Sequence, residues 1–361
     1  MNLVFEINHP AQAHLFKNLI VQLQDRQHKV SVLIKQHPIV ESIFQDSDIP
    51  YTILGRKRKG LILKGLFQIG FILKILKLYQ KHKFQIGIGV SVSLAFLSRF
   101  TRLKAIILDD DDKKATPLFA ALTHKRASVL FRPMALTSEE QFPNTIYYNA
   151  YHEIAYLHPK YFKPDPEILK VQNLKSDEPF FIIRLVSLKA HHDKGIRGLN
   201  NNHLKTIIEL LQPFGKVLIT NESTADFLPG AEKIKIEPAN IHHLMAFARL
   251  VISDGQTMCS EAACLGVPSV RINDFAGRIS YLEEQEKKWK LTFGYSPDQF
   301  SAALNKIEEL LHEPMSTFQQ HRDLMLNEVI DFTAFLVWFV ENYPESKRIM
   351  KETPDYQYNF R

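Results

Sequence analysis

Short apolar runs alternate with segments of helical periodicity along most of the chain. An apolar run bounded by turn-forming residues predicts a buried strand, whereas apolar residues spaced three and four apart predict an amphipathic helix. In the first half the pattern predicts strands at 3–7, 30–34, 51–54, 86–90 and 105–108, and helices at 14–24, 38–45, 61–79 and 93–100. Strands that alternate with helices favour a Rossmann-like layer, a parallel sheet with helices on both faces.

The same alternation returns in the second half. It predicts strands at 180–185, 216–220, 234–236, 250–252 and 267–272, and helices at 203–211, 241–248, 257–265, 297–312 and 316–343. The stretch 157–178 between the halves is rich in proline and charge and predicts a linker. A chain of 361 residues is long enough for two cores. We therefore expect an N-terminal Rossmann-like domain over 1–165, a second over 166–330, and a C-terminal helix and tail over 331–361.

A β-turn-α-turn-β segment at 250–272 is the most informative part of the sequence. Its first strand ends at Asp254-Gly255, Gly266 ends the helix that follows, and Pro268 stops that helix from continuing. In such units, ligands bind where strand ends meet helix N-termini. Gly255 allows a close approach to the backbone. The same turn is needed in any doubly wound sheet, so a phosphate site and a purely structural turn are both open on spacing alone.

The start of this helix has the chemistry of an anion site. The N–H groups of Gln256, Thr257 and Met258 have no acceptor within the helix, and the helix dipole favours a negative group beside them. Glu261 lies one turn further along, where its carboxylate would accept hydrogen bonds from ribose hydroxyls. The segment is therefore suited to a nucleotide with its phosphate at the helix start, beside the alternative of a purely structural turn.

Composition and charge narrow the class of protein. The chain is 45% apolar and 23% charged, as in globular proteins, and its net charge of +6 fits phosphorylated substrates or an anionic membrane surface. Cys259 and Cys264 are the only cysteines, which favours a reducing compartment. The N-terminus lacks a signal-peptide pattern, and no uncharged apolar run is long enough to cross a bilayer. These features predict a cytoplasmic protein.

Several motifs resemble those of the DUF354 family, a GT-B-like group, over about residues 1–340. They are Asn8-His9-Pro10 with His14-Leu15-Phe16, Leu108-Asp109-Asp110, Arg184-Leu185-Val186 and the Asp254-Gly255 segment. The C-terminal motif also resembles the donor-binding segment of MurG-type glycosyltransferases and of non-hydrolysing UDP-N-acetylglucosamine 2-epimerases. Its parts are Ser253-Asp254-Gly255, Thr257-Met258, Glu261-Ala262-Ala263 and Leu265-Gly266-Val267-Pro268.

The resemblance implies an α/β protein of the GT-B fold, with two Rossmann-like domains facing an interdomain cleft. It implies a nucleoside-diphosphate sugar, foremost a UDP-sugar, held by the C-terminal domain, and a last helix that packs back on the N-terminal domain. Gly255, Gln256 and Thr257 match the diphosphate position, and Glu261 matches the ribose-binding carboxylate. The resemblance also implies catalysis without a metal or other cofactor.

The chain departs from both enzyme groups at their catalytic motifs. The His-Arg-Arg-Glu-type sequence of the 2-epimerases is replaced by Arg184-Leu185-Val186-Ser187, and the Gly-Gly-His loop of MurG by Pro10-Ala11-Gln12-Ala13-His14. Neither catalytic assignment therefore transfers to this chain.

Candidate catalytic residues stand after predicted strands of the first domain. His14 would open the first helix and act as a general base, or be held by local hydrogen bonds at a helix end. Asp109 and Asp110 begin a run of four carboxylates that repel one another, so a cation or a solvated loop must relieve them. Either aspartate would serve as a base or bind acceptor hydroxyls, unless the run is only a solvated turn and helix cap.

Further candidates lie in the second domain. Arg184 ends its first strand, where a guanidinium would bind the diphosphate, or would instead pair with Asp193 or Glu222. His242 lies where GT-B folds often contact the base of the nucleotide, or is an exposed helix start. In the His191-His192-Asp193 loop, a cleft role for His192 or Asp193 is a better fit than metal binding.

The basic run Arg56-Lys57-Arg58-Lys59 precedes an apolar helix that carries three lysines, a pattern typical of contact with an anionic membrane and also of an ordinary helix with snorkelling lysines. No nucleic-acid-binding module accompanies it.

We expect a glycosyltransferase that transfers a hexosyl or N-acetylhexosaminyl group to a surface polysaccharide or glycolipid precursor. The alternatives are a 2-epimerase-like sugar-nucleotide epimerase and an inactive nucleotide-sugar-binding subunit.

Overall fold

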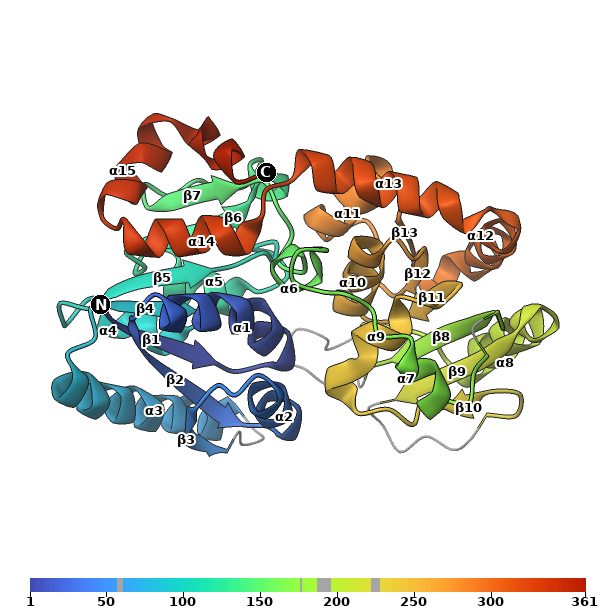
Figure 1. Ribbon diagram of the computed structural model, residues 1–361, viewed down its shortest axis with the longest axis horizontal. Coiled ribbons are helices and arrows are strands. Elements are labelled where there is room, and N and C mark those ends of the chain that lie inside the picture. Colours follow the sequence, from blue (N-terminus) through green and yellow to red (C-terminus); the bar gives the residue numbers. More distant parts are fainter. Residues whose placement is uncertain (57–60, 176, 187–195, 222–227) are drawn as a thin grey trace. The chain divides into compact units, whose positions relative to one another are not determined.

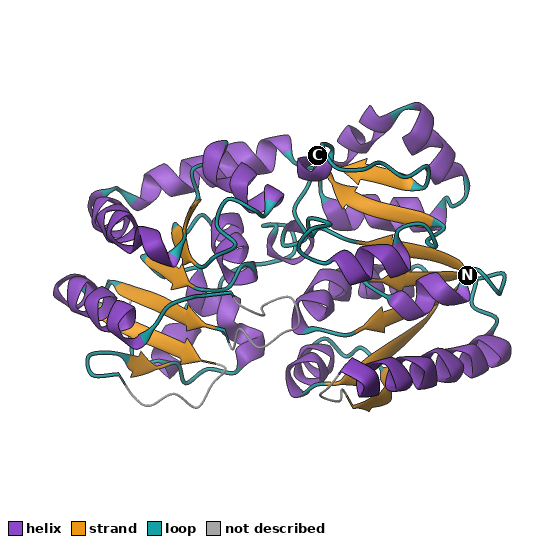
Figure 2. Ribbon diagram, turned by 180° about the vertical axis from the view of Figure 1, so that it is seen from behind, coloured by secondary structure: helices purple, strands orange, loops and turns teal. Residues whose placement is uncertain are grey.

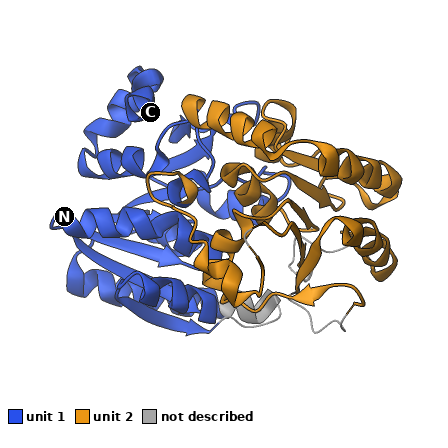
Figure 3. Ribbon diagram, turned by 45° about the vertical axis from the view of Figure 1, so that its right-hand side comes forward, with its two compact units in different colours: residues 1–156, 329–361 blue, residues 157–328 orange. Residues whose placement is uncertain are grey.

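The computed structural model describes residues 1–361 except 57–60, 176, 187–195 and 222–227 (Figure 1). It separates into two compact units (Figure 3). Unit 1 comprises Met1–Tyr156 and Val329–Arg361, and unit 2 comprises Leu157–Glu328. Each unit is a sheet with helices packed around it, as the colouring by secondary structure in Figure 2 shows. Among the described residues, no helix combines the length and the apolarity needed to cross a bilayer.

Unit 1 is built on a parallel sheet that, within its described residues, has seven strands in the order β3-β2-β1-β4-β5-β6-β7. The strands are β1 Asn2–Ile7, β2 Lys29–Gln36, β3 Tyr51–Arg56, β4 Ile86–Gly89, β5 Lys104–Leu108, β6 Val129–Pro133 and β7 Thr145–Tyr148. The helices are α1 Pro10–Asp25, α2 Pro38–Asp46, α3 Leu61–His82, α4 Val92–Leu97, α5 Pro117–Thr123, α6 Ile154–Leu157, α14 Phe332–Glu341 and α15 Glu345–Glu352. The central strands are buried on both faces, which explains why they are continuous apolar runs.

Unit 2 repeats this plan with, in its described part, six parallel strands in the order β10-β9-β8-β11-β12-β13. The strands are β8 Phe180–Leu185, β9 Lys216–Asn221, β10 Glu232–Lys233, β11 Leu250–Ser253, β12 Ser269–Ile272 and β13 Thr292–Tyr295. The helices are α7 Glu167–Val171, α8 Asn201–Leu211, α9 Ile241–Met245, α10 Thr257–Leu265, α11 Ser280–Lys287, α12 Phe300–His312 and α13 Met315–Glu328. Short 3-10 turns join several of these elements.

The C-terminal segment belongs to the core of unit 1. Helix α14 packs against α1, and Phe332 stacks on Tyr148 with ring centroids 4.2 Å apart. Phe335 and Phe339 meet the ring of Phe131 in β6 edge-on, at 5.7 and 4.7 Å. The chain thus leaves unit 1 once and returns to complete it.

Some sequence predictions are wrong in detail. The helix predicted at 316–343 is two helices, because Asp331 interrupts it and caps α14 by accepting the Ala334 N–H at 2.9 Å. The strand predicted at 234–236 is absent from the described structure, where β10 is the pair Glu232–Lys233. The first helix begins at Pro10, with His9 as its N-cap, so His14 does not open it. The linker prediction also omitted helix α7.

Candidate functional site

Four of the predicted site residues lie at the carboxyl ends of strands, two in each unit. Asp109 and Asp110 follow β5, Arg184 is the second-last residue of β8, and Asp254 follows β11. In a parallel sheet, all carboxyl ends share one edge, where ligands of open α/β sheets bind. Each unit therefore offers one such edge.

Asp254 ties together the loops at the carboxyl edge of unit 2. Its Oδ1 accepts the N–H of Val186 at 2.8 Å, and its carbonyl oxygen accepts a hydrogen bond from Asn273 Nδ2 at 2.8 Å. The side chain is buried, and this burial raises the pKa of Asp254 to about 6. Asp254 is therefore a structural link between the segments that follow β8, β11 and β12.

Gly255 brings the turn close to the loop after β8. A Cβ atom there would lie 2.8 Å from Val186 Cγ1, which is closer than a carbon contact allows. The close approach predicted from the sequence is thus made to the protein's own chain. The N–H of Gly255 donates to Ser253 Oγ at 2.9 Å, which fixes the turn that leads into α10.

The start of α10 is suited to an anion. Gln256, Thr257 and Met258 are half-buried, so solvent reaches the first turn. Among the described residues, no side chain caps α10, and its first turn holds no acidic residue. The positive end of the helix dipole is therefore not neutralised from within this turn. At the other end, Gly266 closes the helix with a left-handed backbone at φ 72°.

Two residues that the sequence assigned separately to the nucleoside lie together. Glu261 Oε1 is 2.9 Å from His242 Nε2, and both side chains are about 95% buried, with 6% and 5% of their surfaces exposed. The ring of Phe162 lies edge-on to His242 at 6.4 Å. His242 is therefore a buried partner of Glu261 and not an exposed helix start.

Arg184 is half-buried and donates from Nη1 to Thr220 Oγ1 in β9 at 3.2 Å. Its guanidinium thus lies along the carboxyl edge of the sheet, between β8 and β9. The expected ion-pair partners Asp193 and Glu222 lie outside the described residues. The same holds for His191, His192 and Ser187, and for Lys57, Arg58 and Lys59 of the basic run.

At the carboxyl edge of unit 1, each of the first aspartates has a histidine partner. Asp109 Oδ2 lies 2.6 Å from His124 Nε2, and Asp110 Oδ2 lies 2.9 Å from His152 Nδ1. The Asp109–His124 pair is almost completely buried, whereas the Asp110 side chain is 27% exposed. Among the described residues, no group of three His, Cys, Asp or Glu side chains is placed to hold a metal ion.

The positive charge of Arg132 also offsets the repulsion among the carboxylates of the aspartate run. Its guanidinium is buried, and it lies 2.9 Å from Glu139 and donates to the carbonyl oxygen of Asp111 at 2.8 Å. The run is thus embedded in a network of histidines and an arginine. It is neither a simple solvated turn nor a helix cap.

This environment separates the pKa values of neighbouring groups. Burial raises the pKa of Asp109 above its usual range, although His124 opposes the effect. Burial acts in the same direction on Asp110, but the charge and hydrogen bond of His152 outweigh it and lower the pKa. For His152, burial is outweighed by Asp110, and the pKa is raised. Burial and the charges of Asp110 and Asp109 hold the pKa of Asp111 well above its usual range.

His14 lies in the second turn of α1 and is buried. Its ring stacks on that of Tyr156 with centroids 5.3 Å apart. His14 is therefore a packed residue of the helix, and its predicted role as a base is not tested by this geometry.

At the end of β1, the buried Glu6 accepts hydrogen bonds from Ser91 and, at 3.2 Å, from Ser93.

Sequence reasoning missed several residues of the unit 1 edge: His124, His152, Arg132, Glu139 and Glu6. Only Asp109 and Asp110 carried a signal, since they follow a predicted strand. His152 follows 42 positions later, in a segment of no recognisable motif, and only the sheet order brings β5 and β7 near each other. In this unit β5 was the last strand predicted, so β6, β7 and the residues that they position were not predicted.

A comparison with protein families gives one match. The sequence profile described as protein of unknown function (DUF354) matches residues 2–330. The chain belongs to this family. No curated protein matches it.

Solved structures match nearly the whole chain at low identity. The S. aureus MnaA–UDP co-structure has 12% identity and a TM-score of 0.70, over 96% of this chain and 97% of that one. The UDP-GlcNAc 2-epimerase from Neisseria meningitidis bound to UDP-GlcNAc has 12% identity and a TM-score of 0.64, over 98% and 99%. The calicheamicin glycosyltransferase CalG4 has 13% identity and a TM-score of 0.56, over 95% and 98%. This likeness shows the fold, which is the GT-B fold.

Proposed function

We propose that this DUF354 protein is a glycosyltransferase that uses a nucleoside-diphosphate sugar, foremost a UDP-sugar. The observation that carries the proposal is the start of α10, where an uncapped helix end lies one turn from the Glu261–His242 pair. Solved structures of the same fold hold UDP or UDP-GlcNAc, which supports a nucleotide-sugar donor. The departures from known catalytic motifs mean that its chemistry must come from other residues of this chain.

The donor would be held by unit 2. Backbone N–H groups of Gln256, Thr257 and Met258 would bind the diphosphate, and Arg184 would neutralise part of its charge. Glu261 would accept hydrogen bonds from the ribose hydroxyls, because a carboxylate keeps accepting capacity after one contact. His242 would orient that carboxylate, since the two side chains lie 2.9 Å apart.

The base would be His152 of unit 1. Asp110 faces Nδ1 of its ring, and Nε2 is buried without a hydrogen-bond partner among the described residues. A carboxylate on Nδ1 fixes the tautomer in which Nε2 accepts a proton. Asp109 is a weaker candidate for a base, because its buried carboxylate is paired with His124.

The transfer would proceed as a displacement at the anomeric carbon. The acceptor hydroxyl gives its proton to His152 Nε2 while its oxygen forms the new bond to that carbon. The bond from the anomeric carbon to the diphosphate breaks, and the leaving oxygen takes the electron pair. Arg184 and the start of α10 would stabilise the charge that develops there.

The acceptor class we propose is a precursor of a surface polysaccharide or glycolipid, made by a cytoplasmic enzyme with peripheral membrane contact. Helix α3 supports such contact because Ile69 and Leu73, one turn apart, are 57% and 59% exposed. Exposed apolar side chains on a helix that also bears lysines are typical of interfacial helices.

A second candidate is a sugar-nucleotide 2-epimerase, since a UDP-GlcNAc 2-epimerase matches the chain over almost its whole length. An epimerase must remove and return a proton on the sugar ring, and it needs no acceptor. Free UDP together with a 2-acetamidoglucal-type intermediate, formed from UDP-GlcNAc alone, would identify it.

Thermal shift of the purified chain with UDP, UDP-sugars and other nucleotides tests the donor site. A ligand at about 100 times its dissociation constant adds roughly 2.7 kcal/mol of stability to the native state. We expect stabilisation by UDP compounds that Glu261→Ala removes and Glu308→Ala retains, because Glu308 is an exposed residue of α12. Equal responses of the two variants, or none from any nucleotide, would overturn the donor site.

A further inference from the structure

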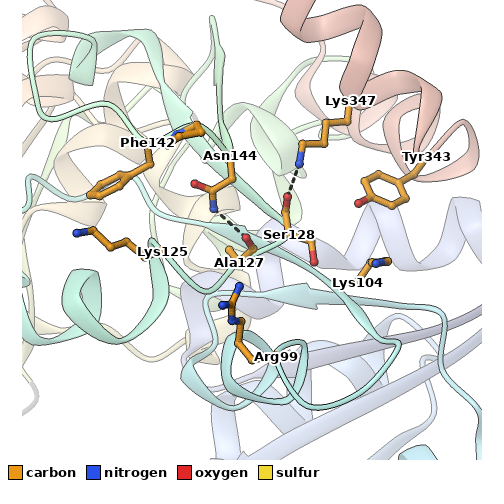
Figure 4. Close-up of a pocket in the computed structure, with 10 residues that line it drawn as sticks. Arg99, Lys104, Lys125, Ala127, Ser128, Phe142, Asn144, Tyr343 and Lys347 are labelled. Atoms are coloured by element: carbon orange, nitrogen blue, oxygen red, sulfur yellow. Dashed lines mark hydrogen bonds between the residues drawn. The ribbon is translucent and has the colours of Figure 1, made fainter.

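A basic pocket lies at the amino-terminal edge of the unit 1 sheet. Its cavity volume is about 510 Å³. Lys104 begins β5, and Ser128 and Asn144 immediately precede β6 and β7, so the pocket lies where these strands start. Figure 4 shows Lys347 reaching from α15 across this edge toward Ser128.

The pocket is separate from the candidate catalytic residues of unit 1. Lys104 begins β5 and Asp109 follows its last residue, so the two are five residue steps and roughly 16 Å apart at about 3.3 Å per step. A molecule bound beside Lys104 therefore lies at the other edge of the sheet from the Asp110–His152 pair. It would not be the group that reacts there.

Positive charge converges on the pocket. Four of its lining residues are cationic: Arg99, Lys104, Lys125 and Lys347. No lining residue in the described structure is acidic. Glu140 interacts electrostatically with Lys125, but it already forms an ion pair with Lys113. The cations of the pocket are thus not neutralised by its own wall.

Lys347 is held in place. Its Nζ donates to the carbonyl oxygen of Ser128 at 2.8 Å, which fixes the ammonium group at the pocket wall. Burial lowers the pKa of Lys347, and repulsion by Lys104 lowers it further. Two ammonium groups that repel each other at a fixed place are stabilised by an anion between them.

The positive charge continues into an adjoining pocket. The second cavity, of about 390 Å³, shares Lys104 and Tyr343 with the first and adds Lys83 and Arg102 to its wall. Its lining residues, too, include no acidic side chain within the described structure. An anion with more than one charged group would find cations on both sides of Lys104.

We propose that this basic pocket binds a phosphate-bearing anion. Ammonium and guanidinium groups form strong, charge-assisted hydrogen bonds to phosphate oxygens. The volume of about 510 Å³ is in the range of small-molecule sites, and the rings of Tyr343 and Phe142 give the wall apolar surface for an attached organic group. The ligand is either a soluble phosphorylated compound or a phospholipid headgroup, which share this chemistry.

Binding of inorganic pyrophosphate to the full chain, measured by calorimetry at low ionic strength, tests the pocket. Lys104→Gln with Lys347→Gln is compared with Lys205→Gln and Lys287→Gln, a control variant that removes the same charge from exposed positions of α8 and α11. We expect the pocket variant to bind pyrophosphate at least about tenfold more weakly, because each lost charge-assisted hydrogen bond corresponds to roughly a tenfold change in affinity. The control variant should change far less.

Vesicles distinguish the two sources of the phosphate group. Co-sedimentation with phosphatidylcholine vesicles, with and without phosphatidylglycerol, is measured for the same variants. If the pocket variant loses binding to phosphatidylglycerol vesicles and the control variant does not, the ligand is a lipid headgroup. If the pocket variant loses binding to pyrophosphate but still binds vesicles as the wild type does, the ligand is a soluble compound. Equal losses in the pocket and control variants, or none in either, would overturn the proposal.

Two controls keep the result interpretable. Lys104→Gln alone changes an exposed side chain, so weaker binding by this variant is not a folding defect. Arg184→Gln should leave the pocket's share of pyrophosphate binding intact, because Arg184 belongs to unit 2. Loss in Arg184→Gln with none in Lys104→Gln would place the anion at the donor site instead and reject the pocket.

Discussion

The buried carboxyl group of Asp254 links the stability of unit 2 to pH. Its pKa is raised from 3.8 to about 6 by burial, so the folded state holds the proton more tightly than the unfolded chain. The stabilisation by this proton is complete below pH 3.8 and is lost as pH rises through about 6. A pKa difference of this size corresponds to roughly 3 kcal/mol.

Asp254→Asn should remove this dependence, because an amide does not titrate. From about pH 4 to 7, the variant's unfolding free energy should rise relative to the wild type's by up to about 3 kcal/mol. Urea unfolding of both proteins across this range measures the difference. A constant difference would show that Asp254 does not titrate as its burial implies.

The Asp110–His152 pair predicts the pH dependence of the proposed transfer. His152 acts as a base only when deprotonated, and Asp110 raises its pKa. Asp110→Asn leaves burial as the main effect, so the pKa of His152 falls and the acidic limb of kcat/KM moves to lower pH. His152→Gln should lower kcat by about 10²–10⁴ and leave the KM for the donor largely unchanged.

Initial rates from about pH 5 to 9 measure the shift. Glu140→Gln is the control, because Glu140 is exposed and pairs with Lys113 away from the histidine. An acidic limb that stays in place in Asp110→Asn would mean that another group is the base.

The residues of the candidate site were predictable where they are close in sequence. The strand end at Asp254 and the helix start at Thr257 are separated by two residues, so local pattern sufficed. His242 and Glu261 were each predicted, but their contact was not, since it depends on how α9 packs near α10. His152 carried no local signal, because its partner Asp110 comes from another strand end.

At the scale of elements, Gly89 allows β1 and β4 to lie side by side. A Cβ atom on Gly89 would be 2.7 Å from the carbonyl oxygen of Glu6, a backbone atom that cannot move alone. Gly89→Ala should therefore destabilise unit 1 by about 1–3 kcal/mol, the usual effect of overpacking. It should also disturb Glu6, whose carboxylate accepts hydrogen bonds from Ser91 and Ser93.

Gly70→Ala is the matched control. Gly70 lies within α3, and a Cβ atom there would have nothing within 4 Å. This variant should be neutral or more stable by up to about 1 kcal/mol, because alanine favours helix over glycine. Denaturant unfolding compares the two variants, and equal effects would show that space at Gly89 is not the reason for its glycine.

The predictability of the elements follows the strength of their local pattern. The helix at α10 was predicted with its observed bounds, because Gly266 and Pro268 mark its end. The break between α13 and α14 was missed, since Asp331 caps a helix inside an otherwise continuous helical pattern. β6, β7 and β13 were missed because polar residues or a glycine interrupt their short apolar runs, as Arg132, Thr145 and Gly294 do.

At the scale of the whole molecule, the order of the two units along the chain determines which segments each unit requires in order to fold. Unit 2 is one continuous segment, whereas unit 1 is completed by Val329–Arg361. The return of the chain was predicted only through a family resemblance, because sequence spacing does not show which core a terminal helix joins. The aromatic contacts of α14 give the physical reason for its place.

Residues 157–328 should therefore fold alone, and residues 1–156 should not. Without α14, unit 1 loses Phe332, Phe335, Leu336, Phe339 and Val340, each at most 1% exposed. Each such side chain contributes about 1.5–3 kcal/mol, so together they rival the roughly 5–15 kcal/mol that stabilises a typical domain. Circular dichroism with urea unfolding should show a cooperative transition for 157–328 and none for 1–156.

Joining 1–156 to 329–361 through a short glycine-serine linker should restore the cooperative transition. A variant of this joined chain with Phe335→Ala should lose about 3–5 kcal/mol, because a buried phenylalanine leaves a cavity when truncated. Native-like unfolding of 1–156 without the C-terminal segment would contradict the argument, since it would mean that the core of unit 1 is complete before α14 packs on it.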